Sequence, residues 1–287
     1  MPARTWPALR LTFPGALDDD RRDALLLDID DCRAVALDED GASVSLFFTA
    51  PADRDTAATL LAARGWTADA TLTAEDLPDE GWAARSQANL AAVRVGRFIV
   101  APPWDVPDVE SGDATIVILV EPSTGFGTGH HQSTRLCLRA LQALPLDGRR
   151  VLDVGTGSGV LAVAASRLGA ASVVGIDNDP DAIESAQDTL VRNRVAGHLE
   201  VTLGALDDPG LVAADVVCAN LTGTLLRQQG ARVQALIAAG GCAVLSGFTD
   251  DEARWVREAF DDCVVETTYE EEFWVAYVMR RPAAAHA

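Results

Sequence analysis

The sequence predicts an α/β protein in which a doubly wound, mainly parallel sheet follows a smaller α+β unit. Strand-like and helix-like segments alternate from Thr115 to Arg280, which is typical of such a sheet. Within them, the apolar run Arg150–Val154 leads directly into a turn with glycine at 155, 157 and 159, the pattern of a buried strand that bends sharply into a helix. The next strand-like run ends in the carboxylate of Asp177. A glycine turn beside an acidic strand end predicts a nucleoside site.

Residues 1–75 predict the smaller unit. Strands are expected at Leu9–Phe13, Arg33–Leu37, Ser43–Thr49 and Thr67–Thr73, with helices at Asp19–Asp28 and Ala52–Arg64. Gly65 follows the second helix directly and provides a stop signal. The order βαββαβ predicts a ferredoxin-like sandwich, a small fold that suits recognition of a partner. A unit that only buttresses the larger domain is the alternative.

Residues 76–113 predict a connector, and residues 114–287 the larger domain. The connector is expected to hold a helix at Trp82–Leu90 and a strand at Arg97–Ala101, after which two prolines stiffen the chain. The other core strands of the larger domain are expected at Ser172–Asp177, Leu199–Leu203, Asp215–Asn220 and Cys242–Ser246, with helices between them. Two last strands, Cys263–Thr268 and Phe273–Met279, have no helix between them and predict a closing antiparallel hairpin.

The composition excludes several classes of function. Hydrophobic residues make up 48% of the chain, yet no apolar run is long enough to span a membrane and no signal peptide is evident, so we expect a cytoplasmic protein. The five cysteines form no Cys-x-x-Cys pair and there are only four histidines, which predicts reduced thiols and no metal site. All 23 basic residues are arginine, which excludes lysine-dependent chemistry such as a Schiff base. The net charge of −20 disfavours nucleic acid and favours a basic protein as partner.

The spacing of the glycines separates the possible nucleoside cofactors. A dinucleotide fingerprint needs its third glycine where this chain has Val160, and a phosphate loop needs a lysine, so both are excluded. The compact Gly-x-Gly-x-Gly turn after Asp153 resembles the first motif of S-adenosylmethionine-dependent methyltransferases. Bare N–H groups at Gly155 and Gly157 would face the ligand, and Asp177 would accept hydrogen bonds from both ribose hydroxyls. An ordinary strand-to-helix turn is the alternative.

A second distinctive element is the loop that precedes the catalytic sheet. Its glycines at 125, 127 and 129 permit close approach of the backbone to a ligand, and Phe126 is placed to shield a reaction centre from water. Ser133 and Thr134 come next, at positions from which a hydroxyl can either cap the following helix or reach a bound nucleoside. The alternative is a structural loop that ends in a serine cap.

The third element is Asn220, at the carboxyl end of the fourth core strand, where ligands bind in open parallel sheets. Its amide oxygen can accept a hydrogen bond from an amine nucleophile, or its amide can contact the methionine part of the cofactor. Asparagine after a strand is also a common turn former or helix cap, and that alternative stays open.

Five segments taken together carry a resemblance to one family. They are Phe126-Gly-Thr-Gly-His130, Asp153-Val-Gly-Thr-Gly157, Ile176-Asp-Asn-Asp179, Ala219-Asn-Leu221 and Leu245-Ser-Gly247. They are similar to the PrmA family, the bacterial methyltransferases of large-ribosomal-subunit protein eleven, and the likeness extends over about residues 80–280. The chain departs from the family pattern at Ala91-Ala92, where a proline is common, and matches it only loosely at Glu270–Trp274.

The resemblance implies a fold, a cofactor and a substrate. The fold would be a Rossmann-like seven-stranded methyltransferase sheet, and S-adenosylmethionine would contact Thr134, Gly155, Asp177 and Asn220. The substrate would be a ribosomal protein, recognised by the small N-terminal domain and methylated on lysine side chains and an N-terminal amine. The enzyme would act as a monomer without binding nucleic acid directly.

The implied reaction is an in-line attack of a neutral amine on the sulfonium methyl group. It needs alignment more than a strong base, so we expect Asn220 to orient the amine while Phe126 and Thr128 close over it. A methyltransferase of another protein lysine or of a small amine is the enzymatic alternative, because its catalytic half would look the same. A cofactor-binding module that only docks on a partner is the non-enzymatic alternative.

Overall fold

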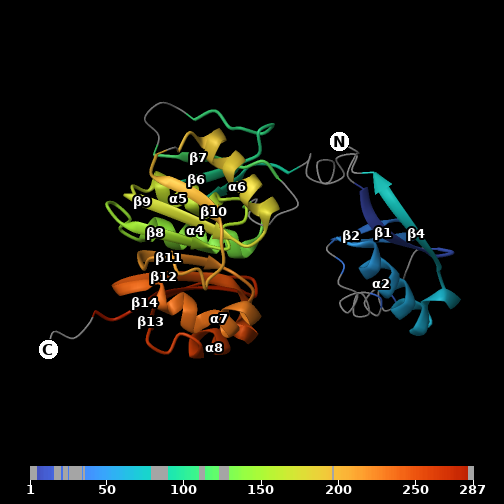
Figure 1. Ribbon diagram of the computed structural model, residues 1–287. Helices are drawn as coiled ribbons and strands as arrows, with labels where there is room; N and C mark the ends of the chain where they lie inside the picture. The colour runs from blue at the N-terminus through green and yellow to red at the C-terminus, as the bar shows by residue number, and fades with distance from the viewer. Residues whose placement is uncertain are drawn as a thin grey trace. The chain divides into compact units, whose positions relative to one another are not determined.

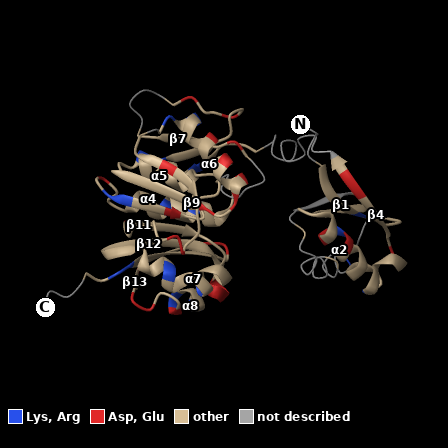
Figure 2. Ribbon diagram, viewed as in Figure 1, with Lys and Arg blue, Asp and Glu red and all other residues tan. Residues whose placement is uncertain are grey.

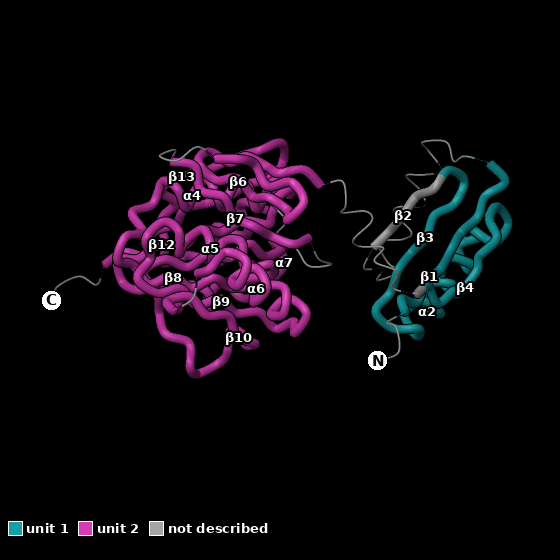
Figure 3. The backbone as a smooth tube through the Cα atoms, turned by 90° about the horizontal axis from the view of Figure 1, so that it is seen from above, with its two compact units in different colours: residues 1–82 teal, residues 83–287 magenta. Residues whose placement is uncertain are grey.

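The computed structural model describes residues 5–15, 21, 25, 34, 36–78, 90–109, 114–122, 129–195 and 197–283. The chain divides into two compact units, Met1–Trp82 and Ala83–Ala287 (Figure 3). Each unit has its own hydrophobic core and is described by itself.

The smaller unit is a four-stranded antiparallel sheet with helical segments (Figure 1). Its strands are β1 (Thr5–Thr12), β2 (Ala36–Asp40), β3 (Ser43–Phe47) and β4 (Thr71–Pro78), in the order β2-β3-β1-β4. Helix α2 (Pro51–Ala63) connects β3 to β4. This strand order is that of the ferredoxin-like sandwich that the βαββαβ pattern predicts. Of the expected first helix, only Arg21 and Leu25 lie within the described residues, and both are helical.

The last strand of the smaller unit begins later than predicted. Thr67–Thr73 was expected as a strand, but Gly65 turns at φ +93° into a single 3₁₀ turn, η1 (Trp66–Ala68), and β4 starts at Thr71. The turn buries the Trp66 ring, which meets Phe13 edge to face at 6.2 Å between ring centroids. Burial of a large aromatic side chain therefore overrides the local alternation that indicated a strand.

The larger unit is built on a seven-stranded sheet in the order β10-β9-β8-β11-β12-β14-β13. The strands are β8 (Arg150–Val154), β9 (Ser172–Asp177), β10 (Leu199–Leu203), β11 (Ala214–Asn220), β12 (Ile237–Thr249), β13 (Val264–Glu271) and β14 (Trp274–Arg280). The first five pair in parallel, and β14 joins β12 and β13 in antiparallel fashion. The predicted strands and the closing hairpin are confirmed. β12 begins five residues before the predicted Cys242.

Helices cover both faces of this sheet. Helices α4 (Gln132–Ala143), α5 (Val160–Arg167) and α6 (Pro180–Asn193) lie on one face, and α7 (Gly223–Ala235) and α8 (Asp250–Glu258) on the other (Figure 1). Alternate residues of each strand serve the two faces: Val151 packs with α4 and α5, whereas Leu152 packs with α7. From β8 the chain adds strands toward one edge of the sheet as far as β10, and it then adds β11 and β12 on the other side of β8. The topological switch point therefore lies at the carboxyl ends of β8 and β11.

Part of the expected connector belongs to the larger unit. Strands β5 (Val93–Val95) and β6 (Phe98–Ala101) form a small sheet with β7 (Ile116–Leu119), and β6 and β7 are parallel. Gln142 of α4 fastens this sheet, because its amide accepts from Arg97 N at 2.9 Å and donates to Val95 O at 3.0 Å. The helix expected at Trp82–Leu90 lies outside the described residues except for Leu90, which is not helical.

Two negative findings hold for the described part of the chain. None of its helices combines the length and apolar character that crossing a membrane requires. Nor do three or more His, Cys, Asp or Glu side chains gather there in a way that could hold a metal ion.

Candidate functional site

The glycine turn after β8 has a backbone that residues with side chains rarely adopt. Gly155, Gly157 and Gly159 have φ of +68°, +54° and +78°. The N–H groups of Gly155 and of the next residue both donate to Ile176 O at 2.9 Å, which ties the turn to the end of β9. A Cβ at Gly155 would lie 2.4 Å from Leu221 Cδ2. The positive φ and the close contact with Leu221 both favour glycine at position 155.

The carboxylate of Asp177 lies directly against this turn. Its Oδ2 accepts from Gly157 N at 3.0 Å, and its Oδ1 accepts from Asp179 N at 3.1 Å. Each carboxylate oxygen has about two acceptor positions, so both oxygens can take a further hydrogen bond. The two predicted halves of the nucleoside site, Gly155–Gly157 and Asp177, are thus brought together.

Asn220 lies on the other side of the turn, because Ala219 of β11 pairs with Val154 of β8. Its Nδ2 donates to Thr134 Oγ1 at 3.3 Å, joining two predicted site residues that are 86 positions apart in the sequence. The Oδ1 atom is buried and has no hydrogen-bond partner among the described residues. A buried acceptor without a donor costs about 1–3 kcal/mol, so this atom is prepared for a ligand donor.

Gly247 holds the segment that carries Asn220. It has φ +92°, and a Cβ at this position would lie 2.3 Å from Leu221 O. Leu221 N in turn donates to Ser246 O at 3.0 Å. Sequence reasoning noted Gly247 only as part of a resemblance and assigned it no role. In the sequence it is a single glycine near the carboxyl end of a buried strand. Such a glycine indicates close approach of another backbone only when the neighbouring strand is known.

Helix α4 begins one residue before the predicted serine cap, so that interpretation was wrong. His131 is the N-cap: its Nδ1 lies 3.3 Å from Ser133 N and 2.8 Å from Ser133 Oγ. Ser133 and Thr134 are therefore inside the first turn, and both are buried. The aromatic ring provides the cap because it also packs edge to face on Trp274, with ring centroids 4.4 Å apart. Burial, together with the nearby Arg135 guanidinium, lowers the pKa of His131.

The described residues that bracket the glycine-rich loop are held against the small sheet. Gly129 has φ +83°, and a Cβ there would lie 2.9 Å from Val100 Cβ. The next residue, His130, makes a hydrogen bond from Nε2 to Ala91 O at 2.9 Å. Phe126 and Thr128, expected to close over the amine, lie outside the described residues, as do the glycines at 125 and 127.

Comparison with known proteins identifies the family. The model of the ribosomal protein L11 methyltransferase (PrmA) family matches residues 18–282. The chain belongs to the PrmA family. Proteins named ribosomal protein L11 methyltransferase from Yersinia pseudotuberculosis and Escherichia coli are each 39% identical to it, over 203 and 210 residues. These alignments cover 70% and 72% of this chain, and 68% and 70% of the relatives.

A solved structure shares the fold of this PrmA chain. The crystal structure of ribosomal protein L11 methylase from Lactobacillus delbrueckii subsp. bulgaricus superposes with a TM-score of 0.61 at 21% identity. The superposition covers 67% of this chain and 100% of that one. The Rossmann-like methyltransferase fold is thereby confirmed, and S-adenosylmethionine is the cofactor of this methyltransferase family.

The described residues of the PrmA site fit this cofactor. Asp177 retains acceptor positions for two ribose hydroxyls, and the turn at Gly155 and Gly157 presents backbone without side chains. The unpartnered Asn220 Oδ1 offers an acceptor at the far side of the turn. The arrangement thus has a carboxylate acceptor on one side of the turn and a separate amide acceptor on the other.

A second unpartnered oxygen lies beneath the turn, on Asp153. This carboxyl is buried, and the Thr156 hydroxyl donates to its Oδ2 at 2.7 Å, whereas Oδ1 has no hydrogen-bond partner among the described residues. Burial raises the pKa of Asp153 from 3.8 to about 6, and the negative charge of Asp177 adds to the rise. The hydrogen bond from Thr156 and the nearby Ala162 N–H lower this pKa and oppose the rise without cancelling it.

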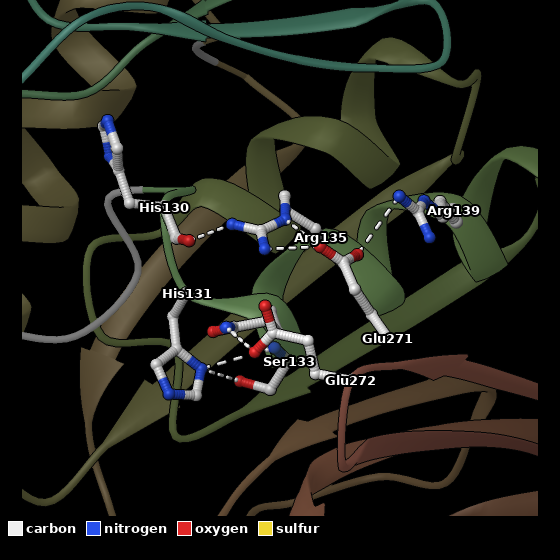
Figure 4. Close-up of polar contacts among 8 residues, drawn as sticks. His130, His131, Ser133, Arg135, Arg139, Glu271 and Glu272 are labelled. Atoms are coloured by element: carbon white, nitrogen blue, oxygen red, sulfur yellow. Dashed lines mark hydrogen bonds and ion pairs between the residues drawn. The ribbon is translucent and has the colours of Figure 1, made fainter.

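Polar contacts join the start of α4 to the tip of the β13–β14 hairpin (Figure 4). The Nε of Arg135 donates to Glu271 Oε1 at 2.8 Å, and its Nη2 bonds to the same oxygen. Arg135 Nη1 also donates to His130 O. Gln132 Nε2 donates to Glu272 Oε2 at 2.8 Å. Sequence reasoning missed this cluster, because its members are as far apart as 140 positions and no local pattern pairs them.

We expect Gly247→Ala to weaken binding of S-adenosylhomocysteine, the demethylated cofactor, by about tenfold or more. The new Cβ must displace the Leu221 backbone and with it Asn220. Gly240→Ala is the matched control, because Gly240 has a similar φ of +77° while its nearest neighbouring atom would lie at 3.8 Å. Isothermal titration calorimetry checks both variants, and equal affinities would show that the contact with Leu221 has no effect on the site.

We expect the stability of Asp153→Asn, relative to that of the wild type, to increase as the pH rises from acidic to neutral. Since the folded-state pKa is raised, the folded chain binds this proton more tightly, and the stability it contributes falls as pH rises from 3.8 through about 6. Between about pH 5 and pH 7.5, the free energy of unfolding of Asp153→Asn should gain about 1.4 kcal/mol on that of the wild type. Urea unfolding at both pH values measures it, and a difference independent of pH would contradict the assignment. Both values avoid the isoelectric point near 4.4.

Proposed function

We propose that this PrmA family member transfers methyl groups from S-adenosylmethionine to amines of ribosomal protein L11, on lysine side chains, on the N-terminal amine or on both. The observation that carries the proposal is the buried, unpartnered Oδ1 of Asn220, the last residue of the strand that pairs with β8 just before the glycine turn. An amine donates hydrogen bonds, so an isolated acceptor at this point suits it. The two curated relatives, named for ribosomal protein L11, support the choice of substrate.

Five residues of the chain would hold the cofactor, and one of them is Asn220. Asp177 accepts the two ribose hydroxyls, and the turn at Gly155 and Gly157 lets the backbone approach the nucleoside. Thr134, already bonded to Asn220, lies where the methionine part is expected. Bound S-adenosylmethionine supplies a methyl group on a cationic sulfonium.

The chain's own contribution to the reaction is to position a neutral amine. A free lysine amine has a pKa near 10.4, and partial burial beside a cation lowers that pKa, which increases the neutral fraction. Asn220 Oδ1 accepts one N–H of the amine and leaves its lone pair directed at the methyl group. Alignment of this kind is worth up to roughly 7–11 kcal/mol in favourable cases. We also propose that Phe126 and Thr128 close over the amine.

Charge favours a basic protein as the substrate. The chain has 43 acidic and 23 basic residues, and acidic residues occur on elements of both units (Figure 2). Such a surface attracts a basic ribosomal protein and repels a phosphate backbone. The ferredoxin-like unit is proposed to recognise the substrate, and the enzyme is proposed to work as a cytoplasmic monomer without contacting nucleic acid.

We expect Asp177→Ala to abolish measurable binding of S-adenosylhomocysteine. Two hydrogen bonds from hydroxyls to a charged acceptor are worth about 1.5–3 kcal/mol each, so the affinity should fall on the order of 10²–10⁴-fold. Asp188→Ala, an exposed aspartate on α6, is the control and should bind as the wild type does. Calorimetry on both purified variants decides, and unchanged affinity of Asp177→Ala would refute the nucleoside site.

We expect a chain lacking residues 1–75 to lose methylation of ribosomal protein L11 while it still binds S-adenosylhomocysteine. Retained binding shows that the larger unit is folded, so loss of methylation reports substrate recognition alone. The assay incubates enzyme, methyl-labelled cofactor and unmethylated ribosomal proteins, and mass spectrometry identifies the labelled protein. Label on a different protein would favour the alternative, a methyltransferase of another protein lysine. Full activity of the shortened chain would remove the recognition role.

A further inference from the structure

Three residues at the start of α4, namely the N-cap His131 and Gln132 and Arg135 of the first turn, contact the hairpin tip (Figure 4). His131 packs its ring on Trp274. Gln132 donates to Glu272, and Arg135 binds Glu271 through both Nε and Nη2. The tip is itself fixed, because Glu271 pairs with Trp274 at the end of the β13–β14 ladder. The hairpin therefore determines where the first turn of α4 lies.

The same turn carries the hydroxyl that orients the site amide. Thr134 is buried and accepts from Asn220 Nδ2 at 3.3 Å. This is the hydrogen bond that the Asn220 amide makes among the described residues, and it leaves Oδ1 as the unpartnered end. Any shift of the turn changes the position of Thr134 and, through it, the direction of Oδ1.

Arg135 and Arg139 bind the same carboxylate in different ways. Arg135 is 20% exposed, makes two N–H contacts with Glu271 Oε1 and also donates to the carbonyl of His130. Arg139, one helical turn later, is 45% exposed and makes a single ion pair with Glu271 Oε2 at 3.1 Å. Two N–H donors on one carboxylate oxygen fix the orientation of the arginine relative to the glutamate, whereas one exposed ion pair hardly restricts it. Arg135 is therefore the member of the pair able to transmit position.

We propose that Glu271, acting through Arg135, is a positioning residue for methyl transfer: the pair holds the first turn of α4 so that Thr134 points the Asn220 amide oxygen at the reacting amine. Neither Glu271 nor Arg135 contacts the amine or the cofactor in this arrangement. The inference rests on the proposed function, because it assigns Asn220 Oδ1 the role of orienting the amine.

The kinetic test compares three full-length variants with the wild type. Glu271→Ala should lower kcat for methylation of ribosomal protein L11 by about tenfold or more, since small misplacements are costly, with KM for S-adenosylmethionine changed less than about threefold. Glu271→Gln keeps an oxygen that accepts both N–H groups of Arg135 and should restore most of kcat. Arg139→Gln, which removes only the exposed ion pair, should resemble the wild type. Equal kcat for Glu271→Ala and Arg139→Gln would overturn the proposal, as would Glu271→Gln failing like Glu271→Ala.

A second readout needs neither cofactor nor substrate. The chain has four asparagines, at 89, 178, 193 and 220, so selective nitrogen-15 labelling gives four side-chain amide pairs in an NMR spectrum. The pair that disappears in Asn220→Asp is assigned to Asn220. It should shift in Glu271→Ala and stay in place in Arg139→Gln.

The two readouts separate the inference from the proposed function. An unmoved Asn220 resonance in folded Glu271→Ala would overturn the positioning role whatever the activity. If the wild type proves inactive on ribosomal protein L11, the proposed function fails, while the NMR comparison still decides whether Glu271 positions Asn220.

Discussion

The site depends on one contact, the hydrogen bond from Gly157 N to the Asp177 carboxylate at 3.0 Å. It forms because Val154 pairs with Ile176 in the parallel sheet, so the turn after β8 overlies the end of β9. The N–H group can point toward Asp177 only with a left-handed backbone, which glycine adopts without steric cost. Because β8 lies between β9 and β11, the same turn is also next to Asn220. One strand order therefore brings Asp177 and Asn220 to opposite sides of one turn.

The site is also where the core leaves hydrogen bonds unmade. Asp153 Oδ1 and Asn220 Oδ1 are both buried without a partner among the described residues, and both flank the β8 turn. Two other buried side-chain atoms among the described residues, Arg10 Nε and Glu271 Oε2, also have no hydrogen-bond partner. The Asn193 amide, in contrast, accepts from Leu119 N at 2.9 Å and donates to Leu119 O at 2.7 Å. Unsatisfied atoms cost stability, and their concentration at one place is typical of a binding site. The raised pKa of Asp153 has the same origin, because burial disfavours its charged carboxylate.

The sequence predicts most of the sheet, because its signals are local. The central parallel strands at 150–154 and 172–177 are mainly apolar runs, whereas the edge strand at 199–203 alternates apolar and polar residues. All three have the predicted limits. Prediction fails where tertiary contacts decide. β12 extends back to Ile237, which pairs with Ala214 of β11, and the register is irregular through Gly240 and Gly241 until pairing resumes at Cys242. His131 caps α4 in place of a serine because Trp274, far along the chain, packs against its ring.

The closing hairpin illustrates why the rest of the site escapes prediction. As a pattern it only completes a sheet, and β13 is its edge strand. In three dimensions, the tip of the hairpin reaches α4, and α4 packs on the same face of the sheet as α5, which starts from the glycine turn. The last strands of the chain thus contact the helix that supplies Thr134 to the switch point. Complementary charges at Arg135 and Glu271 are visible in the sequence, but their pairing across 136 positions follows only from the register of β14 between β12 and β13. The edge hairpin of this fold therefore contacts the same helical turn that bonds to Asn220.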